Sequence, residues 1–347
     1  MVKNMVFNTD GHTRGRWTRP RGMKSKTKPQ DLAAASIAFG VELETAIPVS
    51  SGITVGGYHR GLPVTTAQAT DGTTVSAPAF GASRWKAERD GSIRYQSGEM
   101  PCEFVSPILR GPDALECLAS FTRFLDQIGA RVNDSCGCHI TVSVDSVMWL
   151  TSLTSADELV NARVEFARKL AHIAKWHSRA IYGQTGTGRH LNTSYAAPLR
   201  DEVGRLVRRM VGENDRFRKH DAASLCGRGM LNLKKLVSDG LVEFRAFAGT
   251  TSLHKIEHHL ATVLGLCRRA AQVQCLGGFK KNKVQVERTR NAVEAVKFLW
   301  DYLGWTGSSR PVALGLFGRL HEDFKDYRND ALRLCAKFDA RYPDAAL

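Results

Sequence analysis

The sequence lacks the features that mark a membrane protein or a secreted one. No apolar run reaches the length of a bilayer span. The N-terminal residues hold no secretory apolar core, because they are interrupted by Lys3, Arg14, Arg16, Arg19 and Arg21. We therefore expect a cytoplasmic protein that has no membrane partner.

A second pair of closely spaced cysteines is also absent. The chain has 8 cysteines in 347 residues, and only Cys136 and Cys138 lie close together. One such pair is a poor signature for a zinc site or a disulfide framework. We therefore predict that most of the cysteines are reduced thiols buried in the core.

Acidic residues are few compared with basic ones. The chain has 34 Asp and Glu against 49 Lys and Arg, which gives a formal net charge of +15 and a pI of about 9.6. The imbalance is strongest in residues 1–35, where Asp10 and Asp31 are the only acids. This composition predicts a flexible basic arm. A basic surface attracts anions, so nucleotides, nucleic acid or an acidic partner are candidate ligands.

The rest of the chain is typical of a sizeable core built from helices and strands. Hydrophobic residues make up 43% of the sequence, as in globular proteins. Their spacing predicts strands over 36–47, 85–107 (two strands around Asp90-Gly91), 138–144, 231–233 and 241–247. It predicts helices over 112–129, 155–182, 201–220, 252–275 and 290–338, the last one broken near 304–311. Strands placed between long helices favour an α+β sheet with helices packed on one face.

The run Phe39-Gly40-Val41-Glu42-Leu43-Glu44 places two carboxylates two residues apart in a strand. Side chains alternate along a strand, so Glu42 and Glu44 point to one face and the apolar side chains point to the other. Neighbouring like charges are costly unless a cation lies between them, and Mg²⁺ takes oxygen ligands and accompanies phosphates. The run predicts a metal–nucleotide site, although it also suits the solvent face of an edge strand.

Further polar residues lie on strand-like segments in the same way. Glu103 precedes Phe104-Val105, His139 follows Cys138, and Glu243 and Arg245 are two residues apart. Taken alone, each of these residues could have a purely structural role, for example as a hydrogen-bonded core histidine or in an exposed ion pair. Together on one sheet face they would supply ligands for metals and a guanidinium group for a phosphoryl group.

The order of these motifs resembles the amidoligase family. The resemblance rests on the run at 39–44, on Trp85…Asp90-Gly91-Ser92-Ile93, and on the segments 103–107, 136–142 and 243–250. That family belongs to the carboxylate–amine ligases with a glutamine synthetase-like fold, which include glutamate–cysteine ligases. The resemblance covers roughly residues 37–270. We accordingly expect a basic arm over 1–35, a catalytic domain over 36–276 and a helical C-terminal extension over 277–347.

The resemblance implies an antiparallel sheet whose concave face holds ATP and two or three Mg²⁺ or Mn²⁺ ions. Glu42, His139 and Glu243 would hold one metal, and Glu44 and Glu103 would hold another. Arg245 would contact the phosphoryl group that is transferred.

The resemblance also implies residues that face the substrates. Asp90 would lie beside the acceptor amine and take its proton. Arg189, Asn192 and Tyr195 would face the substrate, with Arg189 also near the nucleotide. Asn232 precedes the last strand as the family's asparagine does.

The reaction that the resemblance implies is ATP-dependent ligation of a small-molecule or peptide carboxylate to an amine through an acyl phosphate. A phosphotransferase on the same metal–ATP face is an alternative, since guanidino kinases share the general fold. A nucleic-acid-binding protein is another, motivated by the basic arm and by Lys280-Lys281-Asn282-Lys283.

Overall fold

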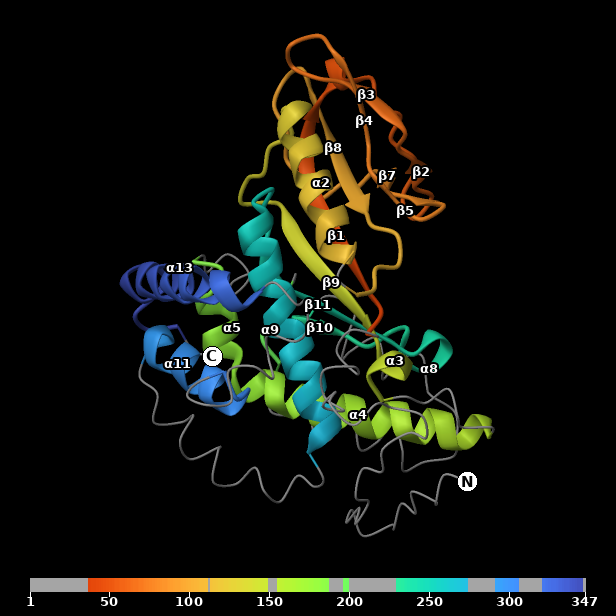
Figure 1. The fold of residues 1–347 in the computed structure, drawn as a ribbon. Coiled ribbons are helices and arrows are strands. Elements are labelled where there is room, and N and C mark those ends of the chain that lie inside the picture. Colours follow the sequence, from red (N-terminus) through yellow and green to blue (C-terminus); the bar gives the residue numbers. More distant parts are fainter. Residues whose placement is uncertain are drawn as a thin grey trace.

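A seven-stranded sheet forms the centre of the molecule in this computed structural model (Figure 1). The strand order is β10-β11-β9-β1-β8-β7-β2, and every pair within it is antiparallel. The strands are β1 (Phe39–Pro48), β2 (Leu62–Pro63), β7 (Lys86–Glu88), β8 (Glu99–Val105), β9 (Gly137–Ser143), β10 (Leu231–Asn232) and β11 (Leu241–Ala248). The structure describes residues 37–111, 113–148, 155–186, 196–199, 229–273, 291–305 and 320–345, without the side chains of 320–327.

Two small hairpins lie beside the sheet, in the segment between β2 and β7. β3 (Thr66–Gln68) pairs with β4 (Thr74–Ser76), and β5 (Ala79–Phe80) pairs with β6 (Ser83–Arg84). A short 3-10 turn, η1 (Val49–Ser51), follows β1 directly.

Helices cover the apolar face of the sheet. Figure 1 shows α2 and α9 lying along the strands. The helices are α2 (Asp113–Gln127), α3 (Val144–Met148), α4 (Ala156–Trp176), α5 (Ser178–Gly183), α8 (Leu236–Asp239), α9 (Leu253–Gln272), α11 (Ala292–Tyr302) and α13 (Leu320–Arg341). The ring of Phe121 on α2 stacks on Trp85 at 3.6 Å between centroids. Burial of such aromatic side chains anchors α2 to the sheet.

Alternation along β1 divides the two faces of the sheet as the sequence predicts. Val41, Leu43 and Ile47 are buried completely in the core, whereas Glu42 lies on the opposite face and is partly exposed. The structure thus confirms an α+β architecture with a large antiparallel sheet. Because the helices pack on the apolar face, the polar side chains of the other face remain available to bind ligands.

The helix predicted over 155–182 is broken in the structure. Ser155 caps α4 by accepting a hydrogen bond from the backbone N–H of Glu158, as its type and position indicate. α4 ends at its C-cap His177, and α5 begins as a separate helix at Ser178. α5 packs against α11 and α13, and a Cβ added at Gly183 would lie 2.6 Å from Ala292 Cβ. The lack of a side chain at Gly183 thus permits the close packing of α5 on α11.

Several predictions from the sequence fall outside the described residues. These are the basic arm over 1–35, the helix over 201–220 and the lysine cluster at 280–283. The six described cysteines are buried thiols, as expected, and they are Cys102, Cys117, Cys136, Cys138, Cys267 and Cys335. Among the described helices, none is long and apolar enough to cross a membrane.

Candidate functional site

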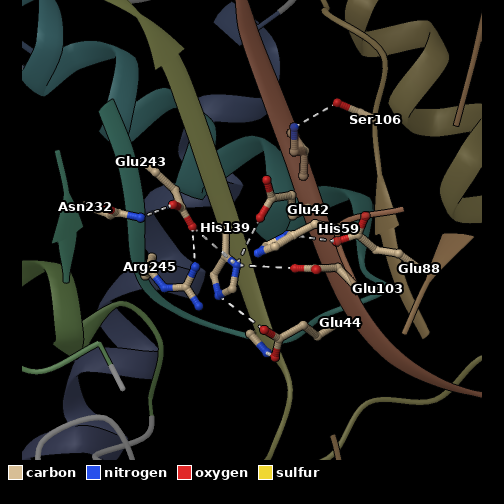
Figure 2. A network of polar contacts seen from close by, with 12 residues as sticks. Glu42, Glu44, His59, Glu88, Glu103, Ser106, His139, Asn232, Glu243 and Arg245 are labelled. Atoms are coloured by element: carbon tan, nitrogen blue, oxygen red, sulfur yellow. Dashed lines mark hydrogen bonds and ion pairs between the residues drawn. The ribbon is translucent and has the colours of Figure 1, made fainter. Parts of the chain in front are cut away.

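Backbone pairing brings the predicted ligands of β1, β8 and β9 onto one face of the sheet. Glu42 on β1 is the register partner of His139 on β9. Glu44 on β1 is the register partner of Glu103 on β8. Directly opposed residues of antiparallel strands point to the same face, so these four side chains meet there. Figure 2 shows them gathered around the imidazole ring.

His139 stands at the centre of this cluster. Its Nδ1 atom lies 3.3 Å from Glu42 Oε2 and 3.6 Å from Glu103 Oε1. Its Nε2 atom lies 3.4 Å from Glu44 Oε1. Glu44, Glu103 and His139 are all buried. A buried imidazole with carboxylates on both ring nitrogens is a site that selects positive charge.

β11 adds a carboxylate and a guanidinium group to the same face. Glu243 Oε1 lies 3.7 Å from His139 Nδ1 and accepts a hydrogen bond from Arg245 Nη1. Its other oxygen, Oε2, accepts a hydrogen bond of 2.7 Å from Asn232 Nδ2 on β10. Asn232 and Glu243 are register partners, so β10 fixes the orientation of this carboxylate. Arg245 is thereby held beside the cluster rather than in open solvent.

Gly137 allows the chain to pass close to the cluster. Its backbone N–H donates a hydrogen bond of 2.6 Å to Glu44 Oε2. A Cβ at this position would lie 2.7 Å from His139 Nε2 and 3.3 Å from Glu44 Oε2. Only glycine leaves room for both side chains, so this residue shapes the site through its lack of a side chain.

The electrostatics of the cluster reflect an excess of negative charge. Burial raises the pKa of Glu103 to about 7, although its hydrogen bond with His139 acts in the opposite direction. Burial alone would lower the pKa of His139, yet its contacts with Glu103, Glu42 and Glu44 raise it well above the usual range. Burial would likewise raise the pKa of Glu42, but its hydrogen bond with His139 and nearby positive charges lower it. Protons on Glu103 and His139 thus reduce the repulsion between the carboxylates. A metal cation bound among these side chains would reduce the same repulsion.

Two groups of side chains could each hold a metal ion. In each group the candidate ligand atoms lie within 4.8 Å of one another. The groups are Glu42, His139 and Glu243, and Glu44, Glu103 and His139. Carboxylate oxygens with one imidazole suit Mg²⁺ or Mn²⁺ better than a thiolate-binding metal. The sequence analysis names the same five residues but assigns His139 to the first group alone, and their role as metal ligands stays a prediction.

Comparison with known proteins identifies the family. The family model described as "Putative amidoligase enzyme" matches residues 35–267. This chain belongs to the amidoligase family. The description of this family as enzymes agrees with a sheet face that gathers carboxylates, an imidazole and a guanidinium group. No curated protein matches the chain at a significant level.

A solved structure resembles this amidoligase only distantly. It is the crystal structure of a bifunctional glutathione synthetase from Pasteurella multocida, with 10% sequence identity and a TM-score of 0.37. The match covers 90% of the amidoligase chain and 53% of the synthetase chain, so this chain spans about half of that protein. A likeness this weak carries no argument about fold or activity.

The predicted substrate residues of the amidoligase have different outcomes. Arg189, Asn192 and Tyr195 lie outside the described residues. Asp90 is described and partly buried, and its Oδ1 atom accepts a hydrogen bond of 2.6 Å from the backbone N–H of Ser92. Its carboxylate therefore shapes the turn after β7, and the two metal-binding groups do not include it. Its role toward an amine stays a prediction.

Sequence reasoning missed one acidic residue on this face of the amidoligase. Glu88 on β7 is the register partner of Glu103 and is only 8% exposed. The available signal was the alternation of Trp85 and Ala87, which places Lys86 and Glu88 on the other face. Glu88 could have been recognised by pairing that face with Glu103.

Proposed function

We propose that this amidoligase joins a carboxylate to an amine at the expense of ATP, using a two-metal nucleotide site on the polar face of the sheet. The observation that supports the proposal is the convergence of two carboxylate–imidazole groups with Arg245 beside them. The antiparallel sheet with helices on its apolar face suits a glutamine synthetase-like fold, which is part of the proposal. ATP and Mg²⁺ or Mn²⁺ are the cofactors it requires.

The five ligands would divide between the two ions. Glu42, His139 and Glu243 would hold one, and Glu44 and Glu103 would hold the other. One neutral imidazole nitrogen binds one metal, so assigning His139 to the first group leaves the second to the carboxylates. Bound Mg²⁺ or Mn²⁺ would neutralise the phosphates of ATP.

The reaction would proceed in two steps, phosphoryl transfer to the carboxylate and attack by the amine. A carboxylate oxygen of the substrate attacks the γ-phosphorus of ATP, and the bond to the bridging oxygen breaks to release ADP. Arg245 can bind the equatorial oxygens of the transferring group, where negative charge builds up. The amine then attacks the carbonyl carbon of the acyl phosphate and expels inorganic phosphate.

The incoming amine must lose protons for the amide to form. A positioned carboxylate can accept one of them, and Asp90 is the residue proposed for this role. Changing Asp90 to Asn would remove this base and keep a side-chain oxygen that accepts the hydrogen bond from the backbone N–H of Ser92. If Asp90 is the base, the Asp90→Asn variant should slow amide formation more than it slows ADP release.

A screen for ATP-dependent condensation tests this proposal. The full-length protein is incubated with ATP, Mg²⁺ and mixtures of carboxylates and amines, and products are detected by mass spectrometry. We expect a mass equal to the two substrates minus water, together with ADP and phosphate, and no product with Glu243→Gln. A phosphorylated product that accumulates without any amide would instead establish a phosphotransferase.

A further inference from the structure

A row of three carboxylates crosses the sheet from its centre toward its edge. Glu44 on β1 pairs with Glu103 on β8, and Glu103 pairs with Glu88 on β7. All three side chains point to the polar face, since directly opposed residues share a face. Glu88 is 8% exposed, so this outermost carboxylate is nearly as buried as the other two.

Glu88 differs from the other two carboxylates in what surrounds it. Neither group that could hold a metal includes it, among the residues that the structure describes. Over the same residues, no hydrogen bond reaches its carboxylate, and no Lys or Arg pairs with it. Its one side-chain partner among these residues is His59, whose Nδ1 lies 3.6 Å from Glu88 Oε1. A mostly buried carboxylate that accepts no hydrogen bond from the described residues is costly to keep charged, and a cation with hydrogens to donate would stabilise it.

His59 lies on a loop that is tied to β7. The backbone N–H of Gly56 donates to Ala87 O at 3.0 Å, and the N–H of Arg89 donates to Gly56 O at 3.0 Å. The His59 side chain is 72% exposed, so water competes strongly for its contact with Glu88. Figure 2 shows Glu88 toward the edge of the network, with the His59 ring drawn on the side of Glu88 that faces Glu42. A ligand that enters from solvent can therefore reach Glu88 by displacing an exposed side chain.

We propose that Glu88 binds the positively charged amine substrate as its ammonium form, beside the metal face. This inference rests on the proposed function and names the place of its second substrate. A primary ammonium group carries three hydrogens that can be donated and fits a carboxylate that lacks hydrogen bonds. Glu88 is a binding residue in this account, while Asp90, two residues further along the chain, remains the proposed proton acceptor.

The position of Glu88 in the row places it next to the proposed metal site but outside it. Directly paired residues on neighbouring strands lie about 5 Å apart at their Cβ atoms. An ammonium group on Glu88 would therefore lie one strand away from the metal site at Glu44 and Glu103. The amine nitrogen would be close to the acyl phosphate without competing with the metals for ligands.

Paramagnetic relaxation with simple probes tests the proposal. The full-length protein is loaded with Mn²⁺, and the ions bound are counted by electron paramagnetic resonance. Methylammonium is then added, and the relaxation rate of its methyl protons is measured by NMR, with methanol as an uncharged probe of the same size. Bound Mn²⁺ accelerates relaxation only for a probe held within a short distance of it.

Two variants decide the outcome. Glu88→Gln is expected to reduce the relaxation enhancement of methylammonium at least fivefold and to leave the Mn²⁺ count unchanged. Glu99→Gln is the matched control, since Glu99 is a poorly exposed carboxylate at the far end of β8, and it should behave as wild type. Methanol should show little enhancement in all three proteins.

Other results would overturn the proposal in distinguishable ways. Unchanged methylammonium enhancement in Glu88→Gln would remove Glu88 from amine binding and leave the proposed ligase function intact. Loss of a bound Mn²⁺ ion in Glu88→Gln would make Glu88 a metal ligand instead. Absence of bound Mn²⁺ in the wild-type protein, seen before any amine is added, would contradict the metal site and this inference together.

Discussion

Glu44 on β1 and Glu103 on β8 occupy paired positions of neighbouring antiparallel strands, and both carboxylates are buried on the same face. Their side chains would repel each other in the absence of positive charge. His139 lies within 3.6 Å of both. A cation bound between the two carboxylates would stabilise this arrangement.

Gly137→Ala should weaken metal binding without unfolding the protein. The added methyl group would lie 2.7 Å from His139 Nε2, so the imidazole or Glu44 must move. We expect the affinity for Mn²⁺ to fall by about 10- to 100-fold, as for other changes that misplace a ligand. A calorimetric titration with Mn²⁺ measures this directly.

Gly91→Ala is the control for that substitution, because a Cβ at Gly91 would meet no atom within 4 Å. It should bind Mn²⁺ as the wild-type protein does. Equal affinities in both alanine variants would show that the close approach at Gly137 has no bearing on the site.

Asn232→Ala should also lower metal affinity, by about tenfold, because Glu243 would lose the hydrogen bond from Asn232 Nδ2 that orients it. Asn232 Oδ1 additionally accepts a hydrogen bond from the backbone N–H of Lys234. Asn232→Asp keeps this acceptor but cannot donate to Glu243 and places a like charge beside it. Recovery of wild-type affinity in the aspartate variant would assign Asn232 to the turn alone.

Affinity for Mn²⁺ should rise with pH between 6 and 8. Burial raises the pKa of Glu103 to about 7, and the surrounding carboxylates raise that of His139 well above its usual value. Both groups therefore hold protons at pH 6 that a metal must displace. Each displaced proton contributes up to about a tenfold change in affinity per pH unit. Titrations at pH 6, 7 and 8 that give one common affinity would contradict this.

Stability should fall as the medium becomes acidic, partly because of His177. Burial lowers the pKa of this histidine to about 3, so it stays neutral in the folded protein. The unfolded chain binds a proton at His177 below its ordinary pKa of about 6.5. The free energy of unfolding therefore decreases as pH falls from about 6.5 toward 3, by up to about 1.4 kcal/mol per pH unit for this group.

His177→Phe tests this contribution, because a phenyl ring can keep the stacking on Phe298 and the tilted contact with Tyr302 without titrating. Urea unfolding at pH 7 and pH 5 should show a smaller loss of stability for the variant than for the wild type. An equal or steeper loss in the variant would mean that other groups carry the pH dependence.

The strands that carry the ligands could be predicted from the sequence because their signals are local. Alternation in Val41-Glu42-Leu43-Glu44 and in Glu243-Phe244-Arg245 fixes which side chains share a face. The family resemblance then grouped residues from separate strands, and the register of β1 with β8 and β9 agrees with that grouping.

Features that depend on contacts between distant segments could not be predicted in the same way. The burial of Glu88 depends on a loop at 56–61 that returns to β7, which no local pattern encodes. The one-residue break between α4 and α5 at His177 likewise has no signal in the local pattern. The turn signal at Asp90-Gly91 is real, but residues 89–98 separate β7 from β8, so it is not a tight hairpin.

The number of Mn²⁺ ions bound by the wild-type protein and by two variants tests the two-metal site most directly. Electron paramagnetic resonance titration should give two ions per chain for the wild type and for the Glu99→Gln control. Glu243→Gln and Glu103→Gln should each retain one ion, because each removes a ligand from a different group. A wild-type protein that binds no Mn²⁺, or variants that both keep two ions, would contradict the account.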